Sequence, residues 1–140
     1  VPKVISEMGG KLLFQRADIQ PGTPTAAFDL DGTIVLALSG NPYAAMANFE
    51  MYYWDIAARF MNCSDYKPDR KSAVLKSEYN KINKHRRLLR AYYEDGEVSL
   101  IDSVHASSVI SNLTKCNCYI DLEAGRSVHI GDSVRVQLFK

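Results

Sequence analysis

The sequence lacks an excess of either charge, and it lacks any long hydrophobic run. Seventeen basic and 16 acidic residues leave a formal net charge of +1 over 140 residues, so composition gives no case for nucleic acid or an anionic membrane as a partner. No stretch approaches the roughly 18 apolar residues that a membrane-spanning helix requires, and no signal-peptide pattern is present. We therefore expect a cytoplasmic protein that binds neither nucleic acid nor membranes.

Cysteine is also scarce. Cys63, Cys116 and Cys118 form an odd set, and no histidine or cysteine lies at zinc-site spacing from the closely spaced pair. The sequence therefore predicts no metal site within it. Because residues two apart in a strand point to the same face, Cys116 and Cys118 are interpreted as two small buried side chains.

The apolar residues, 46% of the total, are enough for a packed core, and the hydrophobic period changes near residue 65. Before that point we predict a short helix over 1–8, strands over 11–19, 25–30 and 33–38, and a long amphipathic helix from Asn41 to about residue 61. After it, a two-residue period predicts strands over 71–81, 87–94, 97–102, 117–122 and 133–139, and allows a helical turn over 107–113. The fold class is therefore mixed, with α/β elements followed by an all-β barrel or sandwich. Because the sequence opens inside a short helix, we expect a longer molecule of which this is the C-terminal piece.

The motif FDLDGT, residues 28–33, has two competing interpretations. It is similar to the phosphorylated-aspartate motif of haloacid-dehalogenase-type phosphatases, in which Asp29 would be the nucleophile, Asp31 the general acid and Mg²⁺ a bridge to the phosphate. Alternatively, Asp31-Gly32 forms the tight turn of an ordinary β-hairpin. We favour the hairpin, because the phosphatase fold requires parallel strands joined by helices, whereas most of the chain beyond residue 70 is predicted to form antiparallel strands.

Residues 39–42, Ser-Gly-Asn-Pro, predict a helix start. Asn41 suits the N-cap, Pro42 suits the first helical position, and Gly40 permits close approach of the backbone. Amides at a helix N-terminus, together with the helix dipole, attract a phosphate. The same four residues are also typical of an ordinary helix cap that binds no ligand.

The order and spacing of several segments resemble a known family. The succession comprises GGKLLFQRADIQPGTP, a hairpin, LALSGNPYAAMANFE with a long helix, RRLLRAYYEDG, HASSVISNLTKCNCYIDLEAG and GDSVRVQLF. Together they are similar to the C-terminal part of the molybdopterin molybdenumtransferases, the bacterial MoeA and gephyrin E-domain family. The resemblance implies that residues 1–65 are the C-terminal half of a molybdopterin-binding α/β domain, and that residues 66–140 are a small C-terminal β-barrel domain.

The same resemblance implies site residues. The catalytic residues would be Gln20, Thr23, Arg90 and Ser107 (or Ser108), and the cofactor-binding residues Gly22, Pro24, Ser39, Gly40, Asn41 and Pro42. The family carries lysines at the positions of Gln20 and Thr23, and a neutral contact in place of a charged one weakens oxyanion binding. Restoring lysine at both positions is therefore expected to raise molybdate-dependent product formation.

The activity that the resemblance implies is insertion of molybdate into adenylylated molybdopterin, with Mg²⁺, by a cytoplasmic homodimer. The family's acidic active-site residues would precede Val1, so we expect the chain alone to be inactive. Two alternatives stay open, a haloacid-dehalogenase-type phosphatase and a non-catalytic binding module. The basic cluster over 81–90 is interpreted as a solvated strand edge rather than an RNA-binding surface.

Overall fold

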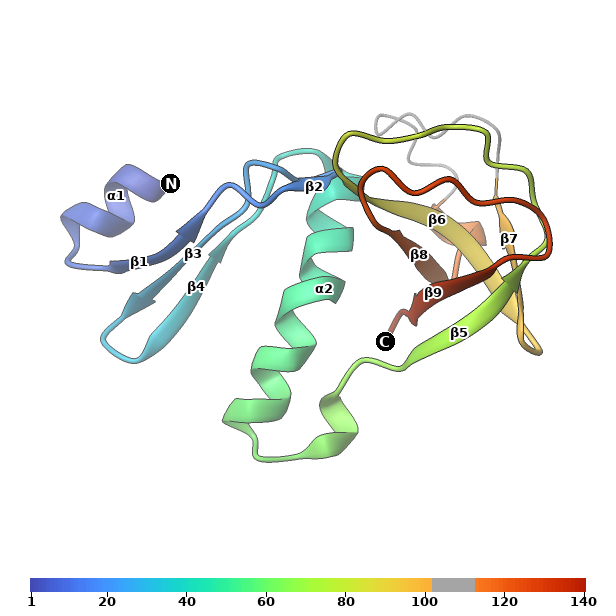
Figure 1. The fold of residues 1–140 in the computed structure, drawn as a ribbon. Helices are drawn as coiled ribbons and strands as arrows, with labels where there is room; N and C mark the ends of the chain where they lie inside the picture. The colour runs from blue at the N-terminus through green and yellow to red at the C-terminus, as the bar shows by residue number, and fades with distance from the viewer. Residues whose placement is uncertain (102–112) are drawn as a thin grey trace.

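The computed structural model describes residues 1–101 and 113–140, with a long helix between a small sheet and a barrel (Figure 1). The N-terminal elements are helix α1 (Pro2–Glu7) and an antiparallel sheet ordered β1 (Lys11–Gln15), β3 (Ala26–Leu30) and β4 (Thr33–Ala37). At the turn from β3 to β4, Asp31 and Gly32 have φ values of 50° and 82°, as a two-residue hairpin turn requires. The predicted hairpin is confirmed.

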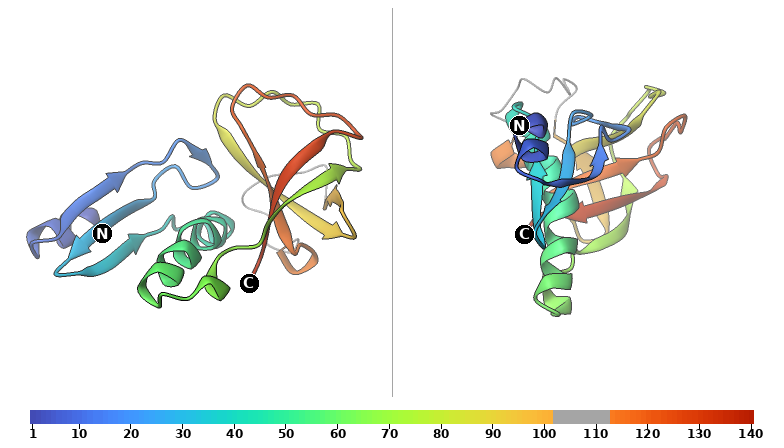
Figure 2. Two further views of the ribbon diagram at one scale, coloured as in Figure 1. Left: turned by 60° about the horizontal axis from the view of Figure 1, so that its bottom comes forward. Right: turned by 90° about the vertical axis from the view of Figure 1, so that its left-hand side faces the viewer.

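Helix α2 (Pro42–Phe60) begins where the sequence predicts. The Asn41 side chain accepts a hydrogen bond from the Ala44 amide at 3.0 Å, and Pro42 occupies the first turn. The helix stands between the three-stranded sheet and the barrel in Figure 1 and in the left view of Figure 2. Among the described residues, no helix is long and apolar enough to cross a membrane.

Five strands of the described chain close into a small barrel, as predicted. They follow the order β6-β7-β5-β9-β8, and β8 pairs back to β6. Their bounds are β5 Arg70–Leu75, β6 Arg86–Glu94, β7 Glu97–Leu100, β8 Cys118–Leu122 and β9 Ser133–Leu138. Short 3₁₀ turns, Ser64–Tyr66 and Leu113–Lys115, precede β5 and β8. The helical turn allowed over 107–113 lies outside the described residues except for its last position.

The barrel core is apolar, with aliphatic side chains from every strand packed inside it. Cys118 belongs to this core and has no exposed surface. Cys116 precedes β8 and is only half-buried, and its thiol donates to the Leu113 carbonyl at 3.2 Å. The prediction of a shared buried strand face is therefore right for Cys118 and wrong for Cys116.

The strand predicted over 11–19 is two strands in two sheets. Arg16, with φ 67°, interrupts it, and β2 (Ile19–Gln20) pairs in parallel with the start of β6 at Arg86 and Arg87. A second parallel pairing joins β5 to β7, whereas the other pairings within the barrel are antiparallel, as predicted for most of this part of the chain. The β2 pairing brings the following turn against the barrel, beside the start of α2.

The long helix is fixed to the barrel by polar and apolar contacts. The Gln137 side chain donates to the Glu50 carbonyl at 2.7 Å, and the Tyr43 hydroxyl donates to the Leu88 carbonyl at 2.8 Å. A separate apolar cluster fills the junction, formed by Ile19, Tyr43, Ala47, Leu88 and Tyr119. The relative position of helix start, turn and barrel is thus set by buried contacts.

Candidate functional site

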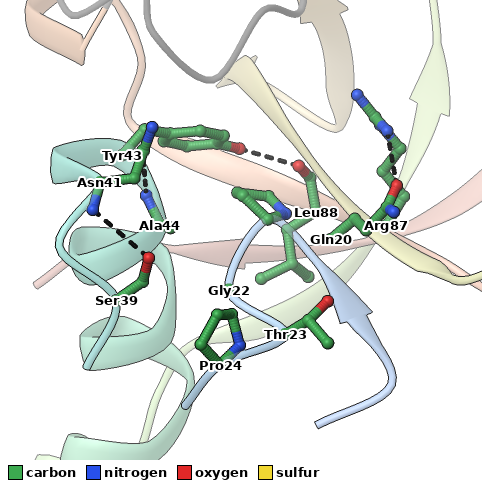
Figure 3. A pocket seen from close by; sticks show the side chains of 11 residues that line it. Gln20, Gly22, Thr23, Pro24, Ser39, Asn41, Tyr43, Ala44, Arg87 and Leu88 are labelled. Carbon is green, nitrogen blue, oxygen red and sulfur yellow. Dashed lines mark hydrogen bonds between the residues drawn. The ribbon is translucent and has the colours of Figure 1, made fainter. Parts of the chain in front are cut away.

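A cavity of about 390 Å³ lies where the turn after β2, the start of α2 and the start of β6 meet (Figure 3). Its walls are residues 20–24 of the turn, Ser39, Asn41, Tyr43 and Ala44 of the helix start, and Arg87 and Leu88 of β6. These segments are separated by tens of residues in the sequence. The β2–β6 pairing and the junction cluster bring them together.

The turn has a backbone shape that only glycine suits at its centre. Gly22 has φ +111°, and a Cβ atom there would lie 1.7 Å from the Asn48 amide nitrogen. Asn48 is fully buried, and this nitrogen donates to the carbonyls of Ala44 at 2.6 Å and Pro21 at 3.3 Å. One asparagine of α2 therefore clamps the turn to the helix. The Gln20–Pro21 peptide bond is cis.

The hydroxyl of Thr23 is engaged within the same turn. Its oxygen donates to the Ile19 carbonyl at 2.8 Å, and the backbone of Thr23 accepts from the Ala17 amide at 3.0 Å. The hydroxyl oxygen retains lone pairs, but its proton is already used. Thr23 therefore stabilises the turn as well as lining the cavity.

The helix start offers fewer amides than the sequence pattern implies. The Asn41 amide donates to the Ser39 hydroxyl at 3.3 Å, and Asn41 in turn accepts from the Ala44 amide through its side chain and from the Ala45 amide through its carbonyl. Pro42 has no N–H group. Most first-turn donors are thus paired inside the protein.

Arg87 contributes a positive charge to the lining of this cavity. Its guanidinium donates from Nη1 to the Gln20 side-chain oxygen at 3.1 Å (Figure 3). Among the described residues that line the cavity, it is the only one that carries a formal charge at neutral pH. The two residues face each other because the β2–β6 register sets Gln20 opposite Arg87.

Tyr43 forms the wall between the cavity and Arg90. Its ring lies 4.5 Å from the Arg90 guanidinium carbon, a cation–π arrangement. Burial raises the pKa of the Tyr43 phenol well above its ordinary value, and the positive charge of Arg90 offsets part of that rise. The phenol therefore stays protonated and donates to Leu88.

The structure brings six of the predicted site residues to this one cavity: Gln20, Gly22, Thr23, Pro24, Ser39 and Asn41. Gly40 and Pro42 lie in the same loop but are exposed and outside the cavity lining. Arg90 is only 2% exposed, behind Tyr43. Ser107 and Ser108 lie outside the described residues.

Sequence reasoning missed the contributions of Pro21, Tyr43, Ala44, Arg87 and Leu88. Pro21 was within the predicted turn, and its place between Gln20 and Gly22 could have indicated it. Arg87 and Leu88 reach the cavity through a two-residue parallel pairing with β2, and such a short non-local pairing leaves no periodic signal in the sequence.

The donor set of the cavity suits an oxyanion better than a cation. Among the described residues of its lining, the polar groups are hydroxyls, amides and one guanidinium, and none is a carboxylate. Mg²⁺ prefers carboxylate oxygens, whereas a guanidinium binds oxyanions through charge-assisted hydrogen bonds. In residues 1–101 and 113–140, no group of three His, Cys, Asp or Glu side chains could hold a metal ion.

Asp29 and Asp31 lie away from the cavity, at the free end of the β3–β4 hairpin (Figure 1). The Asp29 carboxylate accepts a hydrogen bond from the Gly32 amide at 2.8 Å. Both aspartates thus serve the hairpin turn, and β3 is the middle strand of an antiparallel sheet. This is the hairpin arrangement predicted for FDLDGT.

Comparison with known proteins points to one family. Residues 72–139 match the family described as MoeA C-terminal region (domain IV). The molybdopterin molybdenumtransferase of Staphylococcus epidermidis is 28% identical over 99% of the chain, and that of Bacillus subtilis is 26% identical over all of it. The chain spans about a third of the length of these relatives, 34% in both cases.

Solved structures agree with this relationship. The molybdopterin biosynthesis MoeA protein from Pyrococcus horikoshii superposes with a TM-score of 0.80 at 25% identity, covering 99% of this chain and 34% of that one. A molybdenum cofactor biosynthesis protein from Pyrococcus furiosus gives a TM-score of 0.76 at 25% identity, covering 93% of this chain and 46% of that one. The resemblance predicted from the ordered motifs is confirmed: residues 72–139 match the MoeA C-terminal region, and the chain as a whole is similar to the C-terminal third of molybdopterin molybdenumtransferases.

Proposed function

We propose that the chain serves molybdenum cofactor biosynthesis as the C-terminal part of a molybdopterin molybdenumtransferase, which inserts molybdate into adenylylated molybdopterin. In this proposal, residues 1–65 complete an α/β molybdopterin-binding domain and residues 66–140 form its C-terminal barrel domain. The observation that carries the proposal is the cavity at the junction. Six residues that the family resemblance assigned to the substrate site, from two separate segments, line that one cavity.

The chemistry of the cavity matches the charge of the proposed substrates. Molybdate and the substrate phosphate are both tetrahedral oxyanions, which bind guanidinium groups and neutral hydrogen-bond donors. Arg87 provides the guanidinium, and the side chain of Asn41 provides a neutral polar group at the helix start. The positive end of the α2 dipole adds a smaller attraction of the same sign.

These residues can bind and orient a substrate, but they provide no general base. Among the described residues that line the cavity, the ionisable groups are the Arg87 guanidinium and the Tyr43 phenol, and burial raises the pKa of Tyr43 so that the phenol stays protonated. The described residues of the lining do not fit Mg²⁺ either, because none of them is a carboxylate. We therefore expect the 140-residue chain to bind substrate without turnover, with the chemistry supplied by the rest of a cytoplasmic homodimeric enzyme.

No observation favours the phosphatase alternative, because Asp29 is occupied by the hairpin turn. The non-catalytic binding module differs from the first proposal only in turnover. Substrate binding by the complete protein without molybdate-dependent product would favour the module.

The proposal is tested by measuring the equilibrium binding of adenylylated molybdopterin to the unmodified protein and to a variant in which a larger side chain blocks the cavity. Ser39→Tyr should weaken binding at least about tenfold, because the larger ring would occupy the half-buried edge of the site. Ser72→Tyr is the matched control, because Ser72 lines a separate cavity of about 340 Å³ on the barrel. The proposal is wrong if the unmodified protein does not bind the pterin, or if both variants weaken binding equally.

A further inference from the structure

We propose that a second cavity, on the outer face of the barrel, binds a small dicarboxylate. This cavity has a volume of about 340 Å³ and is lined by α2 and by strands β5, β6, β8 and β9. The described residues that line it do not overlap with those of the junction cavity. Its volume is at the lower end of the range for small-molecule sites. The proposal is independent of the proposed function.

The first observation is the charge of the lining. Among its described residues, the cavity carries four cations and one carboxylate, which are Arg70, Lys71, Arg86, Arg135 and Asp121. The four cations come from three different strands, whereas the whole chain has a net charge of only +1. A cleft lined mainly by one sign of charge raises the local concentration of ligands of the opposite sign. The lining therefore suits an anion.

The second observation is the spacing of two of the arginines. Arg70 and Ser72 are two residues apart on β5, as are Arg135 and Gln137 on β9, and residues two apart in a strand point to the same face. Ser72 pairs with Arg135, and Arg70 pairs with Gln137. Arg70 and Arg135 are thus one strand and two residues apart, roughly 8 Å between Cα atoms. This spacing favours a ligand with two separate anionic groups over a single tetrahedral ion.

The third arginine, Arg86, is already held inside the cavity. Its guanidinium donates two hydrogen bonds of 2.7 Å to the carboxylate of Asp121, whose side chain is only 14% exposed. Arg135 lies 3.7 Å from the same carboxylate. We therefore assign the Arg86–Asp121 pair to the wall of the site rather than to ligand binding.

Arg70 and Arg135 have partners that a ligand can replace. Arg70 donates to Asp55 of α2, and Arg135 donates to Glu123 at 2.8 Å. Neither acid belongs to the described lining, and all four side chains are between 44% and 61% exposed. Exposed ion pairs contribute little to stability, so an incoming anion can displace both acids at small cost.

These partners also indicate the chemical class of the ligand. Both are carboxylates, and the planar guanidinium matches a carboxylate through two parallel N–H donors. A dicarboxylate would take the place of Asp55 at Arg70 with one group and of Glu123 at Arg135 with the other. Ser72 adds a hydroxyl to the same lining.

The test is calorimetric titration of the protein with succinate at constant ionic strength. Arg70→Gln and Arg135→Gln should each weaken succinate binding roughly tenfold to hundredfold, the range for a lost hydrogen bond to a charged group. Lys76→Gln is the matched control and should leave binding unchanged, because Lys76 is an exposed cation that pairs with Glu97 at 2.9 Å outside this cavity. Acetate, which has one carboxylate, should bind at least about tenfold more weakly than succinate.

Removing the competing acids separates binding from damage to the fold. Asp55→Asn and Glu123→Gln each release one arginine, so each should tighten succinate binding by up to about fivefold, the factor that corresponds to an exposed ion pair. Glu97→Gln also removes an exposed acid of the barrel and should leave the affinity unchanged. A variant that only disturbs the fold would weaken binding rather than tighten it.

The outcomes are independent of pterin binding. Succinate binding that requires Arg70 and Arg135 and tightens in Asp55→Asn supports the proposal, whether or not the protein binds the pterin. Absence of succinate binding, equal affinity for acetate and succinate, or equal weakening by Lys76→Gln overturns it. Binding of a glutamate-rich peptide without binding of succinate also overturns it and assigns this face to a protein partner.

Discussion

Replacing Gly22 by alanine is expected to destabilise the protein strongly, because Gly22 lies against a buried side chain. The new Cβ would lie 1.7 Å from the Asn48 nitrogen and 2.6 Å from its Cγ, so Asn48 must move. Asn48 has no exposed surface and holds two carbonyls, and losing those hydrogen bonds costs about 1–3 kcal/mol. The left-handed backbone adds about 1–2 kcal/mol for any residue with a Cβ, for a total of about 2–5 kcal/mol.

Gly32→Ala is the matched control for this change. Gly32 also has a left-handed φ, +82°, but nothing lies within 4 Å of a Cβ built there. Gly32→Ala should therefore lower the free energy of unfolding only by the cost of a left-handed backbone, about 1–2 kcal/mol. In urea unfolding followed by circular dichroism, Gly22→Ala should therefore be less stable than Gly32→Ala by about 1–3 kcal/mol, which corresponds to a melting temperature roughly 4 °C lower per kcal/mol.

A third variant tests the assignment of that difference to Asn48. In an Asn48→Ala background the clash is absent, so Gly22→Ala should cost about as much as Gly32→Ala does. Equal destabilisation by Gly22→Ala and Gly32→Ala in the unmodified protein would refute the clamp between the turn and α2. So would a Gly22→Ala penalty that is unchanged when Asn48 is removed.

Two other predictions concern the junction and the barrel core. Tyr43→Phe removes the hydrogen bond to Leu88 and should cost about 1–2 kcal/mol in urea unfolding. Burial raises the pKa of Tyr43, so the stability that its protonated phenol provides is complete below the unfolded-state pKa of about 10 and is lost as pH rises above it. Tyr43→Phe should therefore reduce the loss of stability at alkaline pH. An identical dependence of stability on pH in the variant and the unmodified protein would contradict this. Burial in the barrel raises the pKa of the Cys118 thiol to about 12, so this thiol should react with a disulfide reagent at pH 8 only after unfolding, and rapid labelling of Cys118 in the folded protein, located by mass spectrometry, would contradict that assignment.

Local sequence signals predicted the elements that local contacts determine. The left-handed pair Asp31-Gly32 forms its hairpin, and Asn41 with Pro42 starts α2 at the expected residue. Alternation of apolar residues located four barrel strands to within two residues at each end, but β5 ends at Leu75, six residues before the end of the strand predicted over 71–81. In each case the signal and the structure lie within the same few residues, so no tertiary information was required.

Non-local pairing explains what the sequence did not predict. A left-handed Arg16 divides one predicted strand into β1 and β2, and the parallel partner of Gln20 is 67 residues away at Arg87. The basic cluster over 81–90 was interpreted as a solvated edge, yet Arg90 is buried against Tyr43 of α2. A charged side chain is usually exposed. Arg90 is buried because the Tyr43 ring, from the distant helix α2, packs against it.

The account depends most on where the pterin binds. The direct measurement is a two-dimensional NMR titration of the isotope-labelled protein with adenylylated molybdopterin, following the backbone amides and the Arg87 side chain. The largest shift changes are expected in the residues with an N–H group that line the junction cavity, which are Gln20, Gly22, Thr23, Ser39, Asn41, Tyr43, Ala44, Arg87 and Leu88. Shift changes concentrated instead at residues 70–72 and 135–137, around the separate barrel cavity, would contradict it.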